Sequence, residues 1–320
     1  MDSILFIGYS NLVKTRILPI VAQAGFREVA IARFAGQEWD DGWKACPVPV
    51  TRYDDYQTGL DRFKGNLVYV STVNSQHAFW ARKALKAGFH TVIDKPATCS
   101  AAEAEELVAL AREKGLLLAE STVYLCHPQL AVVKQLFADH HDAPKLLTVH
   151  FSMPPFRPDN FRYQRALGGG AIMDTAPYAV SVGRYFFDAA PLSVDCLVNE
   201  RQADGLDLEY SLLMQYPGGH SLIGHFGFNT EYINRVHLMG TRLNLSLDRV
   251  FTIPDSLENP IRVRHLNEES VVLAPCANNF LLYLAAIRQR IATGDFESDY
   301  AALLADAEAK DAMMNSANTR

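Results

Sequence analysis

The sequence predicts two domains of different fold class: an α/β domain with a doubly wound parallel sheet over residues 1–122, and an α+β domain with helices and an open antiparallel sheet over residues 123–320. Three observations predict this division. Apolar strands and helical segments alternate five times before residue 120, as in a doubly wound parallel sheet. From about Lys145 strands follow one another without intervening helices. The 320 residues suffice for two domains of roughly 100–200 residues each.

The N-terminal apolar run is the first strand of the predicted parallel sheet. Ile4–Ile7 is apolar throughout, as in strands buried on both faces, and it leads directly into Gly8. We expect a helix over residues 14–23, in which Pro19 implies a kink or a short first turn, and a second strand at Val29–Ala32. Together these elements have the length of about 30 residues expected of a βαβ unit.

The turn after this strand matches a dinucleotide-binding motif only in part. The motif G-x-G-x-x-G uses one glycine for the turn, one for close approach of the pyrophosphate and one for helix packing. Here Gly8 is kept, Ser10 stands at the second position and Val13 at the third. Serine is small enough to admit a phosphate, and its hydroxyl could donate a hydrogen bond to it. A buried strand followed by a tight turn fits the bare pattern equally well.

The residue after the second strand discriminates between the two nicotinamide dinucleotides. A carboxylate there accepts hydrogen bonds from the adenosine ribose, whereas a 2′-phosphate requires a cation. This chain has Arg33 directly after the strand and no carboxylate before Glu38. If a dinucleotide binds, NADP(H) is favoured over NAD(H), because guanidinium matches phosphate in charge and geometry. An exposed loop arginine is the competing interpretation.

A strand–helix–strand stretch in the middle of the first domain carries its polar candidates. Leu67–Val70 and Thr91–Ile93 are buried strands, followed by Thr72–Asn74 and Asp94–Pro96. Ligands of open α/β sheets bind just beyond the carboxyl ends of the strands, so both segments should face one crevice. Lys95 is then either a surface charge at a strand end, the commoner case on spacing alone, or an ammonium that orients a substrate beside a cofactor.

The remaining elements follow from the same rules. Residues 46–66 contain a third strand and a short helix. Ser100 and Glu103 form a capping box ahead of a helix that ends at Gly115, and a buried strand follows at Leu116–Glu120. The strands expected in the second domain are Leu146–Met153, Leu192–Asn199, Leu208–Tyr216, Ser221–Phe228 and Arg235–Met239, and the closing helices span residues 279–291 and 300–316.

The composition is that of a folded protein without a basic nucleic-acid surface. The chain is 49% apolar and 21% charged with a net charge of −6, so nucleic acid is not an expected partner. No apolar run approaches the ~20 residues that span a bilayer, and the N-terminus lacks the basic region of a signal peptide. The five scattered cysteines contain no CxxC pair, and His140 and His141 lack partners at ligand spacing. We therefore expect a cytoplasmic protein without a metal site or a membrane partner.

Five motifs follow one another in the order of a known family. They are Ile7–Asn11, Val68–Pro96, Tyr124–Gln129, Gly168–Tyr178 and the closing helices. On these motifs the chain resembles, over essentially its full length, the glucose–fructose oxidoreductase, inositol dehydrogenase and MocA family (Gfo/Idh/MocA). The family's Glu-Lys-Pro appears here as Asp94-Lys95-Pro96, and its Asp followed four residues later by His or Tyr appears as Asp174 and Tyr178.

The resemblance implies an N-terminal Rossmann domain and NAD(P)-dependent hydride transfer at a hydroxyl or carbonyl carbon of a sugar or nucleotide-sugar-like substrate. It implies that Lys95 hydrogen-bonds the reacting oxygen, that Asp174 orients the substrate and that Tyr178 exchanges the proton. Asp174 and Tyr178 share one helix face at i and i+4, and a neighbouring ammonium would favour the phenolate. The residues expected at the cofactor are Gly8, Tyr9, Ser10, Asn11, Leu12, Arg33, Ser71, Thr72, Asn74, His77, Asp94 and Lys95.

Several side chains near these motifs allow two interpretations each. By analogy with the family His77 lies near the cofactor, but it could equally be a surface histidine at a helix start. Arg157, Arg162 and Arg165 could bind a phosphorylated or nucleotide-linked substrate, or could belong to a solvated loop, which is the commoner outcome. His127 either lines the pocket or has a structural role, and the structural role is favoured.

The combination of Lys95, Asp174 and Tyr178 favours a working oxidoreductase. The alternative is a non-catalytic relative that acts as a dinucleotide-binding sensor or partner protein. A transferase or hydrolase on the same scaffold is a weaker alternative, since fold alone does not fix function.

We expect a homodimer or homotetramer that assembles through the antiparallel sheet. One face of such a sheet is left open by the layers of its own domain, and apolar side chains on it need covering. The residues expected on this face are Leu222, Ile223, Phe226 and Phe228.

Overall fold

The computed structural model describes residues 3–319, which form two compact units. The first unit extends to Ser121 and includes Phe280–Leu304, and the second consists of Thr122–Asn279 and the residues from Ala305 onward. The sequence analysis assigned residues 280–304 to the second domain, whereas the contacts within the structure group them with the first.

The first unit is built on a six-stranded sheet of order β3-β2-β1-β4-β5-β6, in which all pairs are parallel. Its strands are β1 Ser3–Ile7, β2 Glu28–Ala32, β3 Val50–Tyr53, β4 Leu67–Val70, β5 His90–Ile93 and β6 Leu118–Glu120. The strand order reverses between β1 and β4, and this reversal creates a crevice at the carboxyl edge where such sheets bind ligands. The predicted doubly wound fold is confirmed.

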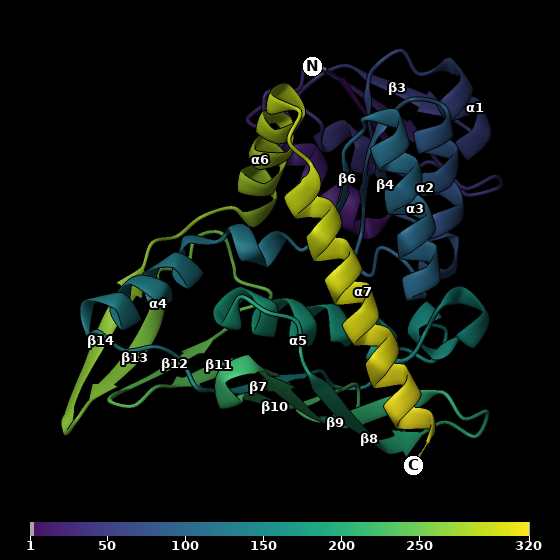
Figure 1. Ribbon diagram of the computed structural model, residues 1–320. Helices are drawn as coiled ribbons and strands as arrows, with labels where there is room; N and C mark the ends of the chain where they lie inside the picture. Colours follow the sequence, from purple (N-terminus) through teal and green to yellow (C-terminus); the bar gives the residue numbers. More distant parts are fainter. Residues whose placement is uncertain (1–2, 320) are drawn as a thin grey trace. The chain divides into compact units, whose positions relative to one another are not determined.

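Helices cover both faces of this sheet. Helices α1, α2 and α3 lie side by side on one face, and α6 lies on the other with the short turns that follow β1 (Figure 1). The helical elements of the unit are η1 Val13–Ile17, η2 Leu18–Ile20, η3 Asp41–Ala45, α1 Tyr56–Arg62, η4 Asn74–Gln76, α2 His77–Lys86, α3 Ala101–Lys114, α6 Asn279–Thr293 and the first residues of α7 Glu297–Asn318.

The segment after β1 does not form the Pro19-interrupted helix expected over residues 14–23. It forms a π-helical turn, η1, followed by a 3-10 turn, η2, that contains Pro19. Proline has no N–H to donate to the carbonyl one turn earlier, so a regular α-helix cannot continue through it. By contrast, Ser100 caps α3 as expected, because its hydroxyl accepts from Glu103 N. The Glu103 side chain accepts from Cys99 N rather than from Ser100 N, so the capping box forms only in part. The helix ends at left-handed Gly115.

The second unit contains an eight-stranded sheet of order β14-β13-β12-β11-β7-β10-β9-β8. The pairs are antiparallel except β7 with β10. Its strands are β7 Leu146–Ser152, β8 Ser193–Arg201, β9 Asp207–Tyr216, β10 His220–Gly227, β11 Ile233–Met239, β12 Leu243–Asp248, β13 Asn259–His265 and β14 Glu268–Ala274. The five strands expected from the sequence are present, and three further strands were not predicted.

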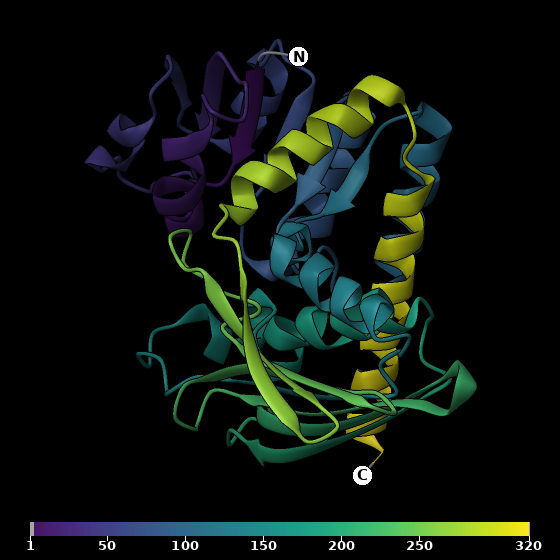
Figure 2. The same ribbon diagram turned by 90° about the vertical axis from the view of Figure 1, so that its left-hand side faces the viewer.

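Helices α4, α5 and the end of α7 cover one face of this sheet (Figures 1 and 2). The expectation of strands without intervening helices is wrong, because the 17-residue α5 separates β7 from β8. The helical elements of the unit are η5 Val123–Cys126, α4 Pro128–Asp139, η6 Phe161–Tyr163, η7 Arg165–Leu167, α5 Ala171–Phe187, η8 Pro217–Gly219 and the end of α7.

The face of the sheet under the helices is the apolar core of the second unit. Leu222, Phe226 and Phe228 are fully buried there, so their expected position on an open face is wrong. Side chains alternate along a strand, so residues an even number of positions apart share a face. Of the four residues expected on the open face, Ile223 is the one whose side chain points away from the helices. Its side chain is 46% exposed. Among residues 3–319, no helix is long and apolar enough to cross a membrane.

Candidate functional site

Gly8 directly follows β1, at the point where the first sheet reverses its strand order. Its φ of +119° lies in the region that favours glycine, and a Cβ at this position would lie 2.0 Å from the carbonyl oxygen of Ser71. Asn11 and Leu12 then begin the helical turns, so their N–H groups have no carbonyl of a preceding turn to bond. Such N–H groups at a helix start can receive a phosphate, so the loop fits a dinucleotide.

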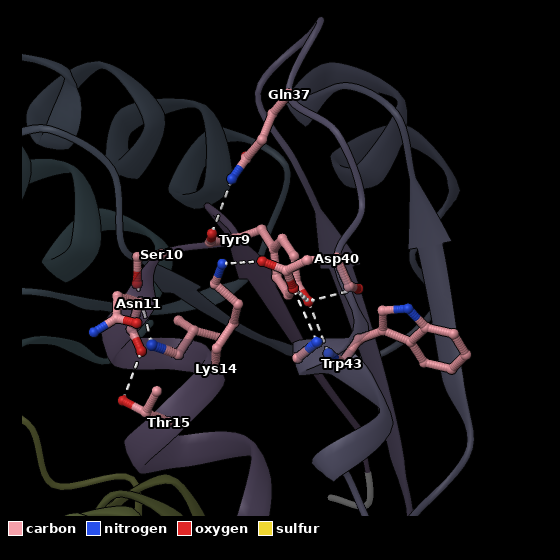
Figure 3. Close-up of polar contacts among 10 residues, drawn as sticks. Tyr9, Ser10, Asn11, Lys14, Thr15, Gln37, Asp40 and Trp43 are labelled. Atoms are coloured by element: carbon pink, nitrogen blue, oxygen red, sulfur yellow. Dashed lines mark hydrogen bonds and ion pairs between the residues drawn. The ribbon is translucent and has the colours of Figure 1, made fainter.

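The side chain of Tyr9 is used inside the protein, because it anchors the segment after β2 (Figure 3). Its hydroxyl donates to Asp40 Oδ1 at 2.6 Å and accepts from Trp43 N at 2.7 Å. Lys14 lies over the Tyr9 ring and binds Asp40 Oδ2 at 2.6 Å. The hydrogen bond from Lys14 contributes most to lowering the pKa of Asp40 to about 2. Any contact of Tyr9 with a cofactor must therefore come from its main chain.

Ser10 and Ser71 link the ends of β1 and β4. Their hydroxyl oxygens lie 2.8 Å apart, and Ser10 Oγ also accepts from Val13 N at 3.1 Å. Ser71 in turn donates to Asp94 Oδ2, at the end of β5. The sequence analysis suggested that the Ser10 hydroxyl donates to a phosphate, whereas the structure directs it into the protein.

Asp94 accepts a second hydrogen bond, from the Tyr69 hydroxyl to Oδ1 at 2.5 Å. That hydroxyl also lies 2.7 Å from Ser121 Oγ, after β6. Burial raises the pKa of Asp94, while the hydrogen bonds from Ser71 and Tyr69 act in the opposite direction. The Asp94 carboxylate is therefore held by Tyr69 of β4 and by Ser71, which directly follows β4.

His77 begins α2 and is only 1% exposed, so the surface interpretation is wrong. Its Nδ1 lies 2.7 Å from Pro96 O and its Nε2 lies 3.1 Å from Thr72 O. The imidazole therefore links the backbone after β4 to the backbone after β5. Its contact after β5 is with Pro96, which follows Lys95 in the chain, whereas Asp94 precedes Lys95. Asn74 is buried in the turn before α2, and Lys95 is partly exposed.

Arg33 follows β2 at the same edge of the sheet. Its Nε donates to Asp54 Oδ1 at 2.9 Å, and its guanidinium lies 5.2 Å from the centre of the Trp39 ring. Trp39 Nε1 also donates to Asp54 at 2.9 Å, and Arg52 lies over the same ring. The hydrogen bond from Trp39 contributes most to lowering the pKa of Asp54. Two guanidinium groups and an exposed carboxylate therefore meet beside this indole.

The start of α5 in the second unit depends on close backbone packing. Gly170 has a φ of +111°, and a Cβ there would lie 2.8 Å from Asp207 Oδ1. Asp207 Oδ2 accepts from Ile172 N at 2.6 Å and so caps the first turn of α5. Burial raises the pKa of Asp207, against the effect of this backbone hydrogen bond. The sequence analysis did not single out Asp207, which lies outside every motif.

Asp174 lies in the first turn of α5 and is 5% exposed. Arg162 Nε donates to its Oδ2 at 2.9 Å, and the Arg162 guanidinium lies 4.9 Å from the ring centre of Phe156 and 4.8 Å from that of Phe161. The arginines expected to act together thus separate into different environments, because Arg157 and Arg165 are exposed.

Tyr178 lies one helical turn after Asp174, and its ring is packed in a cluster of aromatic side chains. Its ring centre is 4.9 Å from that of Phe151, 5.0 Å from that of Phe251 and 5.8 Å from that of Tyr124. These contacts fix the plane of the phenol. Lys95 belongs to the first unit, and Asp174 and Tyr178 belong to the second.

His127 has a structural contact, as the sequence analysis favoured. It is 1% exposed, and its Nδ1 accepts from Gln129 N at 3.1 Å, which caps α4 ahead of Pro128. Burial lowers the pKa of His127. Throughout the described part of the chain, no group of three or more His, Cys, Asp or Glu side chains has the arrangement of a metal site.

The first unit has the features of a dinucleotide-binding Rossmann domain: a parallel sheet with a glycine turn at its switch point, a helix start beyond it and a cation after the second strand. Comparison with protein families identifies which one. Residues 3–122 match the model of the oxidoreductase family with an NAD-binding Rossmann fold, and residues 143–246 match the Gfo/Idh/MocA C-terminal domain. The chain belongs to the Gfo/Idh/MocA family.

Two characterised relatives are similar over much of the chain. A dTDP-3,4-didehydro-2,6-dideoxy-α-D-glucose 3-reductase from Saccharopolyspora spinosa is 33% identical over 241 residues, which are 75% of this chain and 72% of the relative. A D-xylose 1-dehydrogenase (NADP(+)) from Haloferax volcanii is 28% identical over 204 residues, 63% of this chain and 62% of the relative.

The solved structure of a 3-ketoreductase from Actinomadura kijaniata, in complex with NADP and TDP-benzene, superposes with a TM-score of 0.90 at 26% identity. The match covers 99% of this chain and 98% of the other. The expected family, the fold class and the function as an enzyme that transfers a hydride with a nicotinamide dinucleotide are thereby confirmed.

Proposed function

We propose that this enzyme uses NADPH to reduce a keto group on a nucleotide-linked deoxysugar. The observation that carries the proposal is the sequence shared with the dTDP-sugar 3-reductase of S. spinosa over three quarters of the chain. The 3-ketoreductase whose structure matches nearly the whole chain supports the same substrate class. The xylose dehydrogenase, a more distant relative, is the reason to include free sugars in the tests.

Three side chains carry the chemistry in this proposal. The bound nicotinamide supplies the hydride. Lys95 donates a hydrogen bond to the carbonyl oxygen and stabilises the negative charge that develops on it, and Tyr178 gives that oxygen its proton. Asp174 accepts a hydrogen bond from a substrate hydroxyl, and the ion pair with Arg162 fixes the carboxylate in orientation.

Turnover is the direct test of this function. NADPH absorbance should fall when the protein is mixed with dTDP-3,4-didehydro-2,6-dideoxy-α-D-glucose, the substrate in the name of the S. spinosa relative. Lys95→Ala should slow this reaction by about 10²–10⁴-fold. Lys64→Ala, which changes an exposed lysine of the same unit, should not. A protein that binds NADPH but reduces no nucleotide-linked keto sugar would overturn the proposed substrate class.

The preference for NADP(H) rests on the surroundings of Arg33. The side chain lies at the carboxyl edge of the sheet and is held over Trp39, with Arg52 nearby. Its partner in the protein is the exposed Asp54, and we propose that the 2′-phosphate takes the place of this carboxylate. An anion with more charge and three acceptor oxygens is the stronger partner for a guanidinium.

A fluorescence titration with NADPH and with NADH tests this preference. We expect Arg33→Ala to weaken NADPH binding by about tenfold or more and to leave NADH binding nearly unchanged. Asp54→Asn removes the competing carboxylate and should strengthen binding of NADPH alone. Arg62→Ala, an exposed arginine on α1, is the matched control. Equal effects of Arg33→Ala on both nucleotides would contradict the 2′-phosphate contact.

We also propose that two or more copies assemble through the open face of the eight-stranded sheet. Two apolar side chains, Leu197 and Ile223, line a hollow among β7, β8, β9 and β10, and four apolar side chains on this face are about half exposed. They are Leu197, Ile223, Val271 and Leu273. Light scattering at micromolar concentration should show a dimer or tetramer that Ile223→Asp dissociates. A monomeric wild-type protein would contradict the assembly.

A further inference from the structure

A chain of hydrogen bonds crosses three neighbouring strands of the first sheet at its carboxyl edge. It begins at Ser10 after β1, passes through Ser71 after β4 and reaches Asp94 after β5. The Tyr69 hydroxyl of β4 donates to the other oxygen of the same carboxylate, at 2.5 Å. Ser10 lies in the turn after β1, residues 8–12, which we call the nucleotide loop. Asp94 is the residue directly before Lys95.

The direction of the chain follows from counting hydrogens. A carboxylate only accepts, so Ser71 and Tyr69 each give their hydroxyl hydrogen to Asp94. Because Ser71 has no second hydrogen, Ser10 must be the donor in the 2.8 Å contact between the two serines. Ser10 Oγ meanwhile accepts from Val13 N, which holds the first helical turn after the loop. Every hydrogen in the chain therefore points toward Asp94.

The segment that carries Lys95 is held on both sides. Before it, Asp94 N donates to Val70 O at 2.9 Å in addition to the side-chain contacts of Asp94. After it, Pro96 O meets His77 Nδ1 at 2.7 Å, and Ala97 N donates to Glu120 Oε2 at 2.7 Å. The nucleotide loop is tied to this fixed segment through Ser10 and Ser71.

We propose that Ser10, Ser71 and Asp94 act as one positioning unit, which holds the nucleotide loop in register with the main chain of Lys95. The inference rests on the proposed function, because it needs a dinucleotide at the loop. It also accounts for two departures of this chain from the family motifs. Ser10 stands for a glycine and Asp94 for a glutamate, and these two residues are the ends of one chain of hydrogen bonds.

NADPH affinity, measured by fluorescence, tests the unit without any substrate. Ser10→Ala and Ser71→Ala should each weaken NADPH binding by about tenfold, since each breaks a chain that ends on a carboxylate. The double variant should be no weaker than Ser71→Ala alone, because one break already disconnects the loop. Ser71→Thr keeps the hydroxyl and should restore most of the affinity. Ser75→Ala, an exposed serine outside the chain, is the control.

Turnover provides the second measurement. If the unit positions Lys95, Ser71→Ala should also lower kcat at saturating NADPH, and Ser71→Thr should recover it. If Ser71→Ala does not fold, Ser10→Ala, which breaks the same chain at its other end, should weaken NADPH binding and lower kcat at saturating NADPH. Additive effects on NADPH affinity, or an unchanged kcat, would overturn the inference alone. A wild-type protein that binds neither nicotinamide nucleotide would overturn the proposed function and this inference with it.

Discussion

The strand ends of the first unit and the start of α5 in the second hold their polar side chains by different means. In the first region the side chains are bonded to one another, as Ser10 is to Ser71 and Ser71 to Asp94. At the start of α5 the backbone is packed so closely that Gly170 admits no Cβ beside Asp207, and Tyr178 is held by aromatic rings.

The two regions should therefore tolerate different kinds of substitution. A chain of hydrogen bonds is sensitive to the loss of a hydroxyl, although little volume changes. A packed ring keeps its position when its hydroxyl is removed, but a packed backbone cannot accept one extra methyl group. Small chemical changes should therefore act on cofactor binding in the first region, and small steric changes should act on folding in the second.

The largest effect is expected for Tyr178→Phe. Loss of the proposed proton donor should lower turnover by about 10²–10⁴-fold. The ring contacts with Phe151 and Phe251 remain, so the thermal midpoint and the NADPH affinity should stay at their wild-type values. Steady-state kinetics, thermal unfolding and the NADPH titration together check this. A large drop in the thermal midpoint would show that the hydroxyl, not the packing, holds the ring.

The next effect is expected for Gly170→Ala. The new Cβ would displace Asp207 and leave Ile172 N unpaired, and the positive φ adds strain. We expect the free energy of unfolding to fall by about 3 kcal/mol. Gly219→Ala is the matched control, because Gly219 has a φ of +77° and nothing within 4 Å of its Cβ position. It should cost about 1–2 kcal/mol, the strain alone. Equal losses measured by urea unfolding would contradict the close packing at α5.

The smallest effect is expected in the pH dependence of the free energy of unfolding, to which Asp40 of the first unit and Asp207 of the second contribute differently. The pKa of Asp40 is lowered to about 2, so its contribution to stability is present above the unfolded value of about 4 and is lost as the pH falls toward 2. The pKa of Asp207 is raised, so its contribution is present below about 4 and is lost as the pH rises through the folded value.

Asp40→Asn and Asp207→Asn should therefore change the pH dependence of the unfolding free energy in opposite directions. The stability that wild type gains over Asp40→Asn should grow as the pH rises from about 2 to about 4, and it should stay below about 1 kcal/mol because Asp40 is exposed. The difference between wild type and Asp207→Asn should shrink as the pH rises above about 4. Two slopes of the same sign would show that the environments of these carboxylates do not differ as described.

Local sequence patterns predict much of the first unit. The strand at Leu67–Val70 agrees with the structure at both ends, because an apolar run between polar residues has few alternatives. The segment 14–23 was less predictable, since Pro19 rules out a regular helix but does not say which turns replace it. In the second unit β12, β13 and β14 were missed although Leu243–Asp248 alternates apolar and polar residues. Asn and Asp at its polar positions weaken that signal.

The sequence indicates which residues are near the site, but not which hydrogen bonds and ion pairs connect them. Ser10 and Ser71 are 61 positions apart, and no local pattern reveals that one hydroxyl points at the other. Arg162 and Asp174 were both noticed, yet the ion pair between them depends on the turns that precede α5. The roles of Lys95, Asp174 and Tyr178 stay predictions, because they concern a substrate and a cofactor.

We propose above all that the enzyme moves a hydride from NADPH to the carbonyl carbon of a nucleotide-linked sugar. The most direct measurement uses NADPH in which the transferred hydrogen at C4 of the nicotinamide is replaced by deuterium. This NADPH is mixed with the enzyme and the dTDP-linked keto sugar, and the product is analysed by mass spectrometry. We expect one deuterium on the carbon that gains the hydroxyl, and far less product with Tyr178→Phe. A product that forms without deuterium at that carbon would contradict it.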